Sequence, residues 1–102
     1  MSEAPVMTAP TPPHEALPAR VHLIGIGGMA LSAIAGVLLE RGSQISGSDM
    51  AASAYTDRLR VAGATVHIGH GVANLPAADL VVFSAAVPDD NPEMIRAREL
   101  GI

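Results

Sequence analysis

Three amino acids, cysteine, lysine and tryptophan, are missing from this chain of 102 residues. Without cysteine the chain can form neither a disulfide bond nor a thiolate metal site. All six basic residues are arginine, so a phosphate-binding loop of the form G-K-[ST] is excluded as well. The chain therefore has neither a disulfide framework nor the lysine-containing phosphate loop that binds nucleoside triphosphates.

Charge and long apolar runs are also scarce. Charged residues make up 16% of the chain, the formal net charge is -4, and no basic cluster is present, which argues against nucleic acid or an anionic membrane as the main partner. The longest apolar run, around Ile34 to Leu39, is far too short to cross a bilayer. We expect a compact α/β domain that acts in the cytoplasm.

The amino-terminal segment differs in composition from the rest. The first twenty residues hold five of the eight prolines and lack the apolar core of a signal peptide. Residues 1–19 are predicted to be a disordered, Pro-rich tail. The remaining residues, 20–102, have room for one small domain.

Strand and helix patterns alternate along this domain. Short apolar runs at 21–26, 43–49, 64–69 and 78–86 are typical of strands, and amphipathic stretches at 29–42, 53–63 and 91–100 are typical of helices. This order predicts a Rossmann-like, doubly wound parallel sheet of about four strands. The alternation calls for a fifth strand after Gly101, so we expect the domain to be truncated at one edge of the sheet.

A glycine-rich turn follows the first predicted strand. The sequence "GIGGMA", from Gly25 to Ala30, fits G-x-G-x-x-G/A, and Asp49 stands at the end of the second strand, 24 positions after Gly25. Glycines allow backbone N–H groups to approach a phosphate, and the helix that follows adds a favourable dipole. The combination predicts a site for a nucleotide with a pyrophosphate group.

Four segments in order carry a more specific resemblance: "GIGG", "SGSD", "IGH" and the passage "SAAVPDDNP". From about His22 to Ile102 the chain resembles the amino-terminal domain of the Mur ligase family, and within it the ligases that join L-alanine to UDP-N-acetylmuramate during peptidoglycan precursor synthesis. In that family this domain binds the UDP part of the substrate. A central domain binds ATP with Mg²⁺, and a carboxyl-terminal domain brings the amino acid. The resemblance implies that this chain alone binds UDP-N-acetylmuramate, needs no cofactor of its own and carries no catalytic residue.

The resemblance also implies a role for each matched position. The backbone at Gly25, Gly27, Gly28, Met29 and Ala30 would face the diphosphate. Ser48 and Asp49 would face the ribose, and His70 would lie beside the nucleotide. The sugar-nucleotide groove would be lined by Ser84, Ala85 and Ala86. One departure is Ala30, because the family commonly has a third glycine there, although alanine is tolerated at this position of such turns.

Two other functions fit parts of the sequence. Gly25, Gly27, Ala30 and Asp49 also satisfy the fingerprint of an NAD(P)-binding Rossmann domain, in which Gly28 and the "IGH" and "SAAVP" segments have no role. Alternatively, the open sheet edge would allow self-association in a non-enzymatic interaction domain. No metal site is expected, because His67 and His70 are three positions apart on a strand and point to opposite faces.

The histidine pair also spells "HIGH", a tetrapeptide by which class I aminoacyl-tRNA synthetases hold ATP. In those enzymes the tetrapeptide follows the first strand and begins a helix, and a lysine-rich loop completes the site. Here it ends the third predicted strand, and the chain has no lysine. We therefore exclude the synthetase interpretation.

Overall fold

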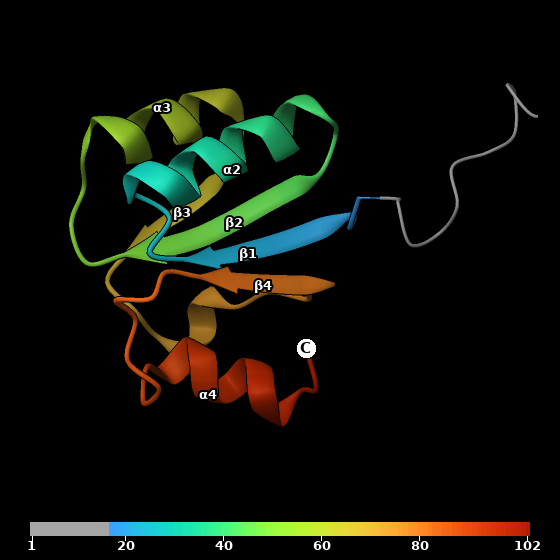
Figure 1. Ribbon diagram of the computed structural model, residues 1–102, viewed down its shortest axis with the longest axis vertical. Coiled ribbons are helices and arrows are strands. Elements are labelled where there is room, and N and C mark those ends of the chain that lie inside the picture. The colour runs from blue at the N-terminus through green and yellow to red at the C-terminus, as the bar shows by residue number, and fades with distance from the viewer. Residues whose placement is uncertain (1–16) are drawn as a thin grey trace, which may run out of the picture.

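The computed structural model describes residues 17–102, so the predicted tail lies almost wholly outside the described residues. Four strands form one parallel sheet: β1 (Arg20–Ile24), β2 (Gln44–Asp49), β3 (Thr65–Ile68) and β4 (Leu80–Phe83). Their spatial order is β3-β2-β1-β4 (Figure 1). The predicted α/β class and parallel sheet are confirmed.

Helices cover both faces of the sheet. Helices α2 (Met29–Glu40) and α3 (Ala54–Ala62) lie side by side on one face, and α4 (Pro92–Glu99) lies on the other with the short 3-10 helix η2 (Val72–Asn74) (Figure 1). The sheet is therefore doubly wound, as predicted. Among residues 17–102, no helix has both the length and the apolar character needed to cross a membrane.

Local sequence explains where two of the helices begin. Ser53 caps α3 in a capping box with Thr56, and the Asn91 side chain accepts hydrogen bonds at the start of α4, where Pro92 occupies the first turn. Helix α3 ends at Gly63, whose φ of 113° lies in the left-handed region that glycine tolerates. These boundaries agree with the predicted ones.

The fourth strand is shorter than the apolar run that predicted it. The run covers 78–86, but β4 ends at Phe83. The backbone then turns, because the Ala86 N–H donates to Ser84 Oγ at 3.0 Å and the Val87 N–H donates to the Ser84 carbonyl at 3.0 Å. Within residues 17–102, β4 pairs only with β1, and self-association through its free edge stays a prediction.

The core holds the loop after β1 in place. Leu23, Ile24 and Ile26 are fully buried, although Ile26 belongs to the glycine-rich turn. A Cβ atom at Gly47 would lie 2.6 Å from Ile26 Cδ1 and 2.5 Å from the Leu23 carbonyl oxygen, so only glycine fits there. The absence of a side chain at Gly47 in β2 thus leaves room for Ile26, which packs there and anchors the turn.

Candidate functional site

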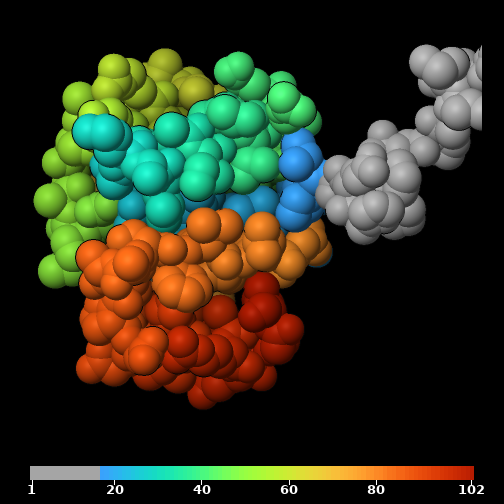
Figure 2. Space-filling model, viewed as in Figure 1, coloured from blue at the N-terminus to red at the C-terminus, as the bar shows by residue number. Residues whose placement is uncertain are grey.

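A pocket of about 540 Å³ opens at the carboxyl ends of the strands. Six of the predicted site residues line it: Gly25, Gly28, Asp49, His70, Ser84 and Ala86. The pocket lies where the chain order reverses between β1 and β4, which is the position at which open α/β sheets bind ligands. In Figure 2 the cyan surface of α2 adjoins the orange surface of β4 and the segment that follows it.

The glycine-rich turn is fixed to the neighbouring strand by its backbone. The N–H groups of Gly25 and Ile26 both donate to the Ser48 carbonyl oxygen, at 2.8 and 3.0 Å. Gly25 has a φ of 88°, which L-residues with side chains rarely adopt. The turn therefore presents a preformed backbone surface to the pocket.

The amino terminus of α2 faces this site without a cap. Gly28 is the N-cap residue, no side chain among residues 17–102 caps it, and no acidic residue lies in the first turn. The first backbone N–H groups of a helix lack intrahelical acceptors and carry the positive end of its dipole. An anionic group such as a phosphate is the complement of this helix end.

Gly27 has a different role from the predicted one. Its N–H donates to Asp49 Oδ2 at 2.8 Å and is not free for a diphosphate. A Cβ at Gly27 would lie 2.9 Å from that oxygen and 3.0 Å from Thr56 Cγ2. Gly27 is needed so that Asp49 can approach the turn, and Asp49 is also one of the residues that line the pocket.

Four other predicted residues lie outside the pocket lining. Ser48 was expected to face a ribose, but its side chain is fully buried and its hydroxyl is used within the protein. Met29 is 75% exposed and lines a separate hollow beside Tyr55. Ala30 is exposed in the first turn of α2, and Ala85 is exposed in the turn after β4. Any contact of Met29, Ala30 or Ala85 with a ligand stays a prediction.

A buried carboxylate, Glu93, stands behind the pocket. Its Oε1 accepts hydrogen bonds from His22 Nε2 at 2.6 Å and from Ser48 Oγ at 2.7 Å. Its Oε2 accepts from the Gly71 N–H at 3.0 Å and from Asn74 Nδ2 at 3.2 Å. One side chain thus ties α4 to β1, β2 and the loop that follows β3.

Hydrogen bonding keeps this carboxylate ionised. Burial by itself raises the pKa of Glu93, but the hydrogen bonds from His22, Ser48, Gly71 and Asn74 outweigh burial and lower that pKa to about 2. A buried carboxylate with four donors is a stable negative charge at neutral pH.

His70 connects this carboxylate to the pocket. Its Nδ1 lies 2.8 Å from Ser48 Oγ and 3.4 Å from Glu93 Oε2, and its side chain is 14% exposed. The sequence predicted His70 as a site residue but did not predict Glu93. The available signal was a histidine in β1, His22, whose burial requires a partner.

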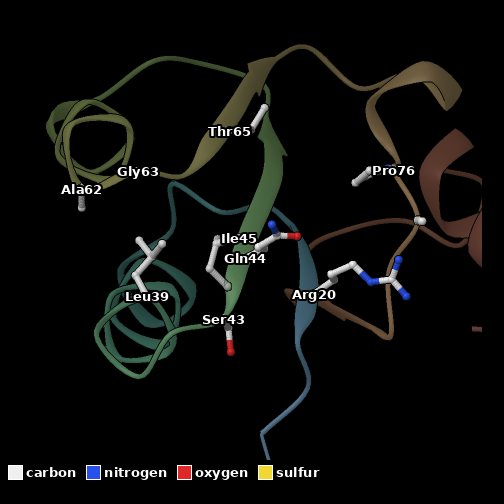
Figure 3. Close-up of a pocket in the computed structure, with 10 residues that line it drawn as sticks. Arg20, Leu39, Ser43, Gln44, Ile45, Ala62, Gly63, Thr65 and Pro76 are labelled. Atoms are coloured by element: carbon white, nitrogen blue, oxygen red, sulfur yellow. The ribbon is translucent and has the colours of Figure 1, made fainter.

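A second pocket, of about 440 Å³, lies at the opposite end of the sheet (Figure 3). Its lining includes the starts of β1, β2 and β3 and the carboxyl-terminal ends of α2 and α3, at Leu39 and Ala62. Helix carboxyl ends carry partial negative charge. The cation in the lining, Arg20, is paired with Asp79 at 2.9 Å, so this pocket is unsuited to a diphosphate.

No group of three or more histidine or acidic side chains within residues 17–102 is placed to hold a metal ion. At the main pocket, the described residues offer hydrogen bonding and dipole stabilisation of an anion.

Known proteins resemble this chain over the same domain. Residues 20–102 match the family described as "Mur ligase family, catalytic domain". The UDP-N-acetylmuramate–L-alanine ligase of Alkaliphilus metalliredigens is 60% identical over 82 residues, covering 80% of this chain and 18% of that protein. The corresponding ligase of Streptomyces coelicolor is 55% identical over 84 residues, covering 81% of this chain and 18% of that protein.

Solved structures agree with the sequence relatives. The UDP-N-acetylmuramate-alanine ligase MurC of Thermotoga maritima superposes with a TM-score of 0.79 at 36% identity, over 81% of this chain and 19% of that one. The murein peptide ligase of Psychrobacter arcticus gives a TM-score of 0.77 at 28% identity, over 82% of this chain and 18% of that one.

This chain spans about a fifth of the length of the relatives it matches. The family match covers the whole described domain apart from its first three residues, and the resemblance found in the sequence is confirmed. The chain belongs to the Mur ligase family, as an amino-terminal domain of that family.

Proposed function

We propose that residues 20–102 bind UDP-N-acetylmuramate, and that they do so as the substrate-recognition domain of a ligase that adds L-alanine to it. The observation that carries this proposal is the pocket at the chain reversal, into which the uncapped amino terminus of α2 opens. This is a preformed site for a diphosphate. The names of the relatives supply the identity of the sugar nucleotide.

The pocket lining divides into two chemical parts under this proposal. Backbone N–H groups at positions 29 and 30, in the uncapped first turn of α2, supply the hydrogen bonds of the anion, whereas the Gly28 N–H donates to the Gly25 carbonyl oxygen at 3.0 Å. Asp49, His70 and Ser84 bring polar side chains to the remaining lining, where hydroxyl and ring N–H groups of a nucleotide need partners. The Ser84 hydroxyl accepts from the Ala86 N–H and keeps its own proton available to a ligand.

We assign the ATP-dependent step to other parts of such ligases. The chain has no lysine for a phosphate loop, and it matches about a fifth of each relative. ATP and Mg²⁺ are accordingly proposed as requirements of the longer proteins. The chain by itself is expected to bind the sugar nucleotide without hydrolysing ATP.

Isothermal titration calorimetry on the 102-residue chain tests this proposal. UDP-N-acetylmuramate is expected to bind with 1:1 stoichiometry and UDP to bind more weakly, because it lacks the sugar. NADH is the control for the dinucleotide alternative and is expected to give no heat of binding. Absence of heat with UDP-N-acetylmuramate up to millimolar concentration, or tighter binding of NADH, would contradict the proposal.

A further inference from the structure

The protons of the buried cluster formed by His22, Ser48, His70 and Glu93 can be assigned from its geometry. An ionised carboxylate only accepts hydrogen bonds, and the pKa of Glu93 is lowered to about 2, so both of its oxygens are acceptors at neutral pH. Ser48 Oγ lies 2.7 Å from Glu93 Oε1 and donates its single proton to that oxygen. The same hydroxyl oxygen is then left only as an acceptor for its second neighbour.

That second neighbour is the imidazole of His70. Ser48 Oγ lies 2.8 Å from His70 Nδ1, so Nδ1 must be the donor and must carry a proton. The 3.4 Å distance between Nδ1 and Glu93 Oε2 favours the same arrangement, since a proton on Nδ1 faces the negative oxygen. In a neutral imidazole with the proton on Nδ1, Nε2 bears a lone pair.

The other ring nitrogen of His70 is open to the pocket. Nε2 forms no hydrogen bond with any group among residues 17–102. Every buried side-chain nitrogen or oxygen in that range has a hydrogen-bond partner, so an atom without a partner is not buried. Nε2 is therefore accessible, and His70 is one of the residues lining the pocket. A ligand in the pocket meets an acceptor at this atom.

We propose that Glu93, acting through Ser48, is a positioning residue that fixes His70 with its proton on Nδ1, so that Nε2 accepts a hydrogen bond from the bound nucleotide. The donor is a ribose hydroxyl or the N3–H group of the base, because phosphate oxygens offer no proton at neutral pH. His70 thereby recognises the nucleoside, while the amino terminus of α2 holds the diphosphate. This inference rests on the proposed nucleotide binding.

Nitrogen-15 NMR of the histidine rings tests the proton assignment directly. In the free 102-residue chain at pH 8, we expect His70 Nδ1 to give a protonated, pyrrole-like resonance and Nε2 an unprotonated, pyridine-like resonance. UDP is expected to shift the Nε2 resonance, whereas inorganic pyrophosphate is expected to shift the Gly28 amide and leave Nε2 unchanged. A protonated Nε2 in the neutral free protein would overturn the inference.

Two modified nucleotides identify the donor. UDP methylated at N3 of the base lacks the ring N–H group, and 2′,3′-dideoxy-UDP lacks the ribose hydroxyls. The analogue without the relevant donor is expected to bind about threefold to tenfold more weakly than UDP and to leave Nε2 unshifted. If both analogues shift Nε2 as UDP does, His70 does not accept a hydrogen bond from the ligand.

A pair of serine variants separates positioning from general stability. Ser48→Ala removes the acceptor of His70 Nδ1, so we expect both neutral ring forms to be populated and UDP to bind about threefold to tenfold more weakly, with pyrophosphate affinity unchanged. The control is Ser46→Ala, which removes a hydroxyl 2.8 Å from His22 Nδ1 but leaves the contact with His70 intact. Equal ring spectra of His70 in both variants would contradict the role of Ser48.

Failure of this inference can be told apart from failure of the proposed function. If UDP-N-acetylmuramate shifts none of the pocket amides, such as those of Gly25 and Gly28, the proposed function fails and this inference with it. If the ligand shifts those amides but His70 Nε2 is protonated, only the inference about Glu93 fails. The measurement on the free protein needs no variant, so it holds even where Ser48→Ala is unstable.

Discussion

The two ends of the parallel sheet differ in electrostatics and in the way they are held together. At the carboxyl end, the amino terminus of α2 opens into a pocket beside the turn at Gly25. At the amino end, the carboxyl-terminal ends of α2 and α3 border the other pocket, with Arg20 already paired to Asp79. Since parallel strands require connecting helices that run antiparallel to them, the same topology makes one end attractive to anions and the other not.

The ends also differ in burial. The carboxyl end is tied together by Glu93, His22 and Ser48, whose side chains are fully buried. The amino end relies on an exposed ion pair, with side chains 47% and 38% exposed, which solvent screens. Changes at the carboxyl end are therefore expected to alter stability and binding together, and changes at the amino end to alter neither strongly.

The largest effect is expected from Glu93→Ala. The substitution leaves the buried donors of His22, Ser48 and Asn74 without an acceptor, and we expect it to lower the free energy of unfolding by about 3 to 5 kcal/mol. Urea unfolding measures this change. The matched control is Glu99→Ala on the same helix, where a 59% exposed side chain pairs with Arg96 and the expected loss is at most about 0.5 kcal/mol. Similar losses in the two variants would contradict the buried network.

Protonation of Glu93 at low pH is expected to remove the stability that its ionised carboxylate contributes, and to do so reversibly. Because the pKa of Glu93 is about 2 in the folded chain, below the ordinary value of 4.5, its contribution is complete above pH 4.5 and declines as the pH falls toward 2. Across that interval, the difference in free energy of unfolding between the wild type and Glu93→Gln is expected to decrease by roughly 3 kcal/mol. Urea unfolding of both proteins at several pH values gives the difference. An advantage that stays constant down to pH 2 would refute the lowered pKa.

A pair of glycine substitutions tests how the turn is anchored. Gly47→Ala places a Cβ 2.5 Å from the Leu23 carbonyl oxygen and 2.6 Å from Ile26 Cδ1, and we expect a loss of about 2 to 3 kcal/mol with displacement of the turn. Gly36→Ala is the control, because nothing lies within 4 Å of the added atom and the helix interior favours alanine by about 0.5 to 1 kcal/mol. The melting temperature should fall for Gly47→Ala and rise for Gly36→Ala. A shift of the same sign would show that contact with Ile26 does not restrict position 47.

The smallest effect on stability is expected from Gly28→Ser. An added Cβ comes no closer than 3.4 Å to the Gly25 carbonyl oxygen, and a serine at the N-cap is expected to stabilise α2 by a few tenths of a kcal/mol. Its hydroxyl would satisfy an N–H group that we assign to the diphosphate, so we expect binding of UDP to weaken about fivefold. Calorimetry should therefore show a lower affinity for UDP, and thermal unfolding should show a slightly higher melting temperature. Unchanged affinity in a correctly folded variant would remove position 28 from the site.

Local signals made much of this fold predictable. The strand, turn and helix around Gly25 are encoded by an apolar run, a glycine-rich turn and an amphipathic stretch that adjoin in the sequence. The caps at Ser53 and Asn91 are likewise decided by residues within three positions. The order of these elements was enough to predict the parallel sheet, and it indicated the end of the sheet at which the main pocket opens.

Contacts between distant residues were not predictable in this way. Glu93 meets His22 across 71 positions and Ser48 across 45, so its burial depends on how α4 packs against the sheet. The same limit applies to Ser48, which the family resemblance implied would face the ribose. Adjacent strand residues point to opposite faces, and Ser48 turns inward toward α4.

The comparison between the two ends is tested most directly by an NMR titration of the 102-residue chain with UDP-N-acetylmuramate. We predict shifts of the backbone amides of Gly25, Gly28, Met29 and Ser84, at the carboxyl end of the sheet. The amides of Gln44, Gly63 and Thr65, which line the pocket at the amino end, are predicted to stay in place. Shifts confined to the amino end, or none at millimolar ligand, would contradict the account.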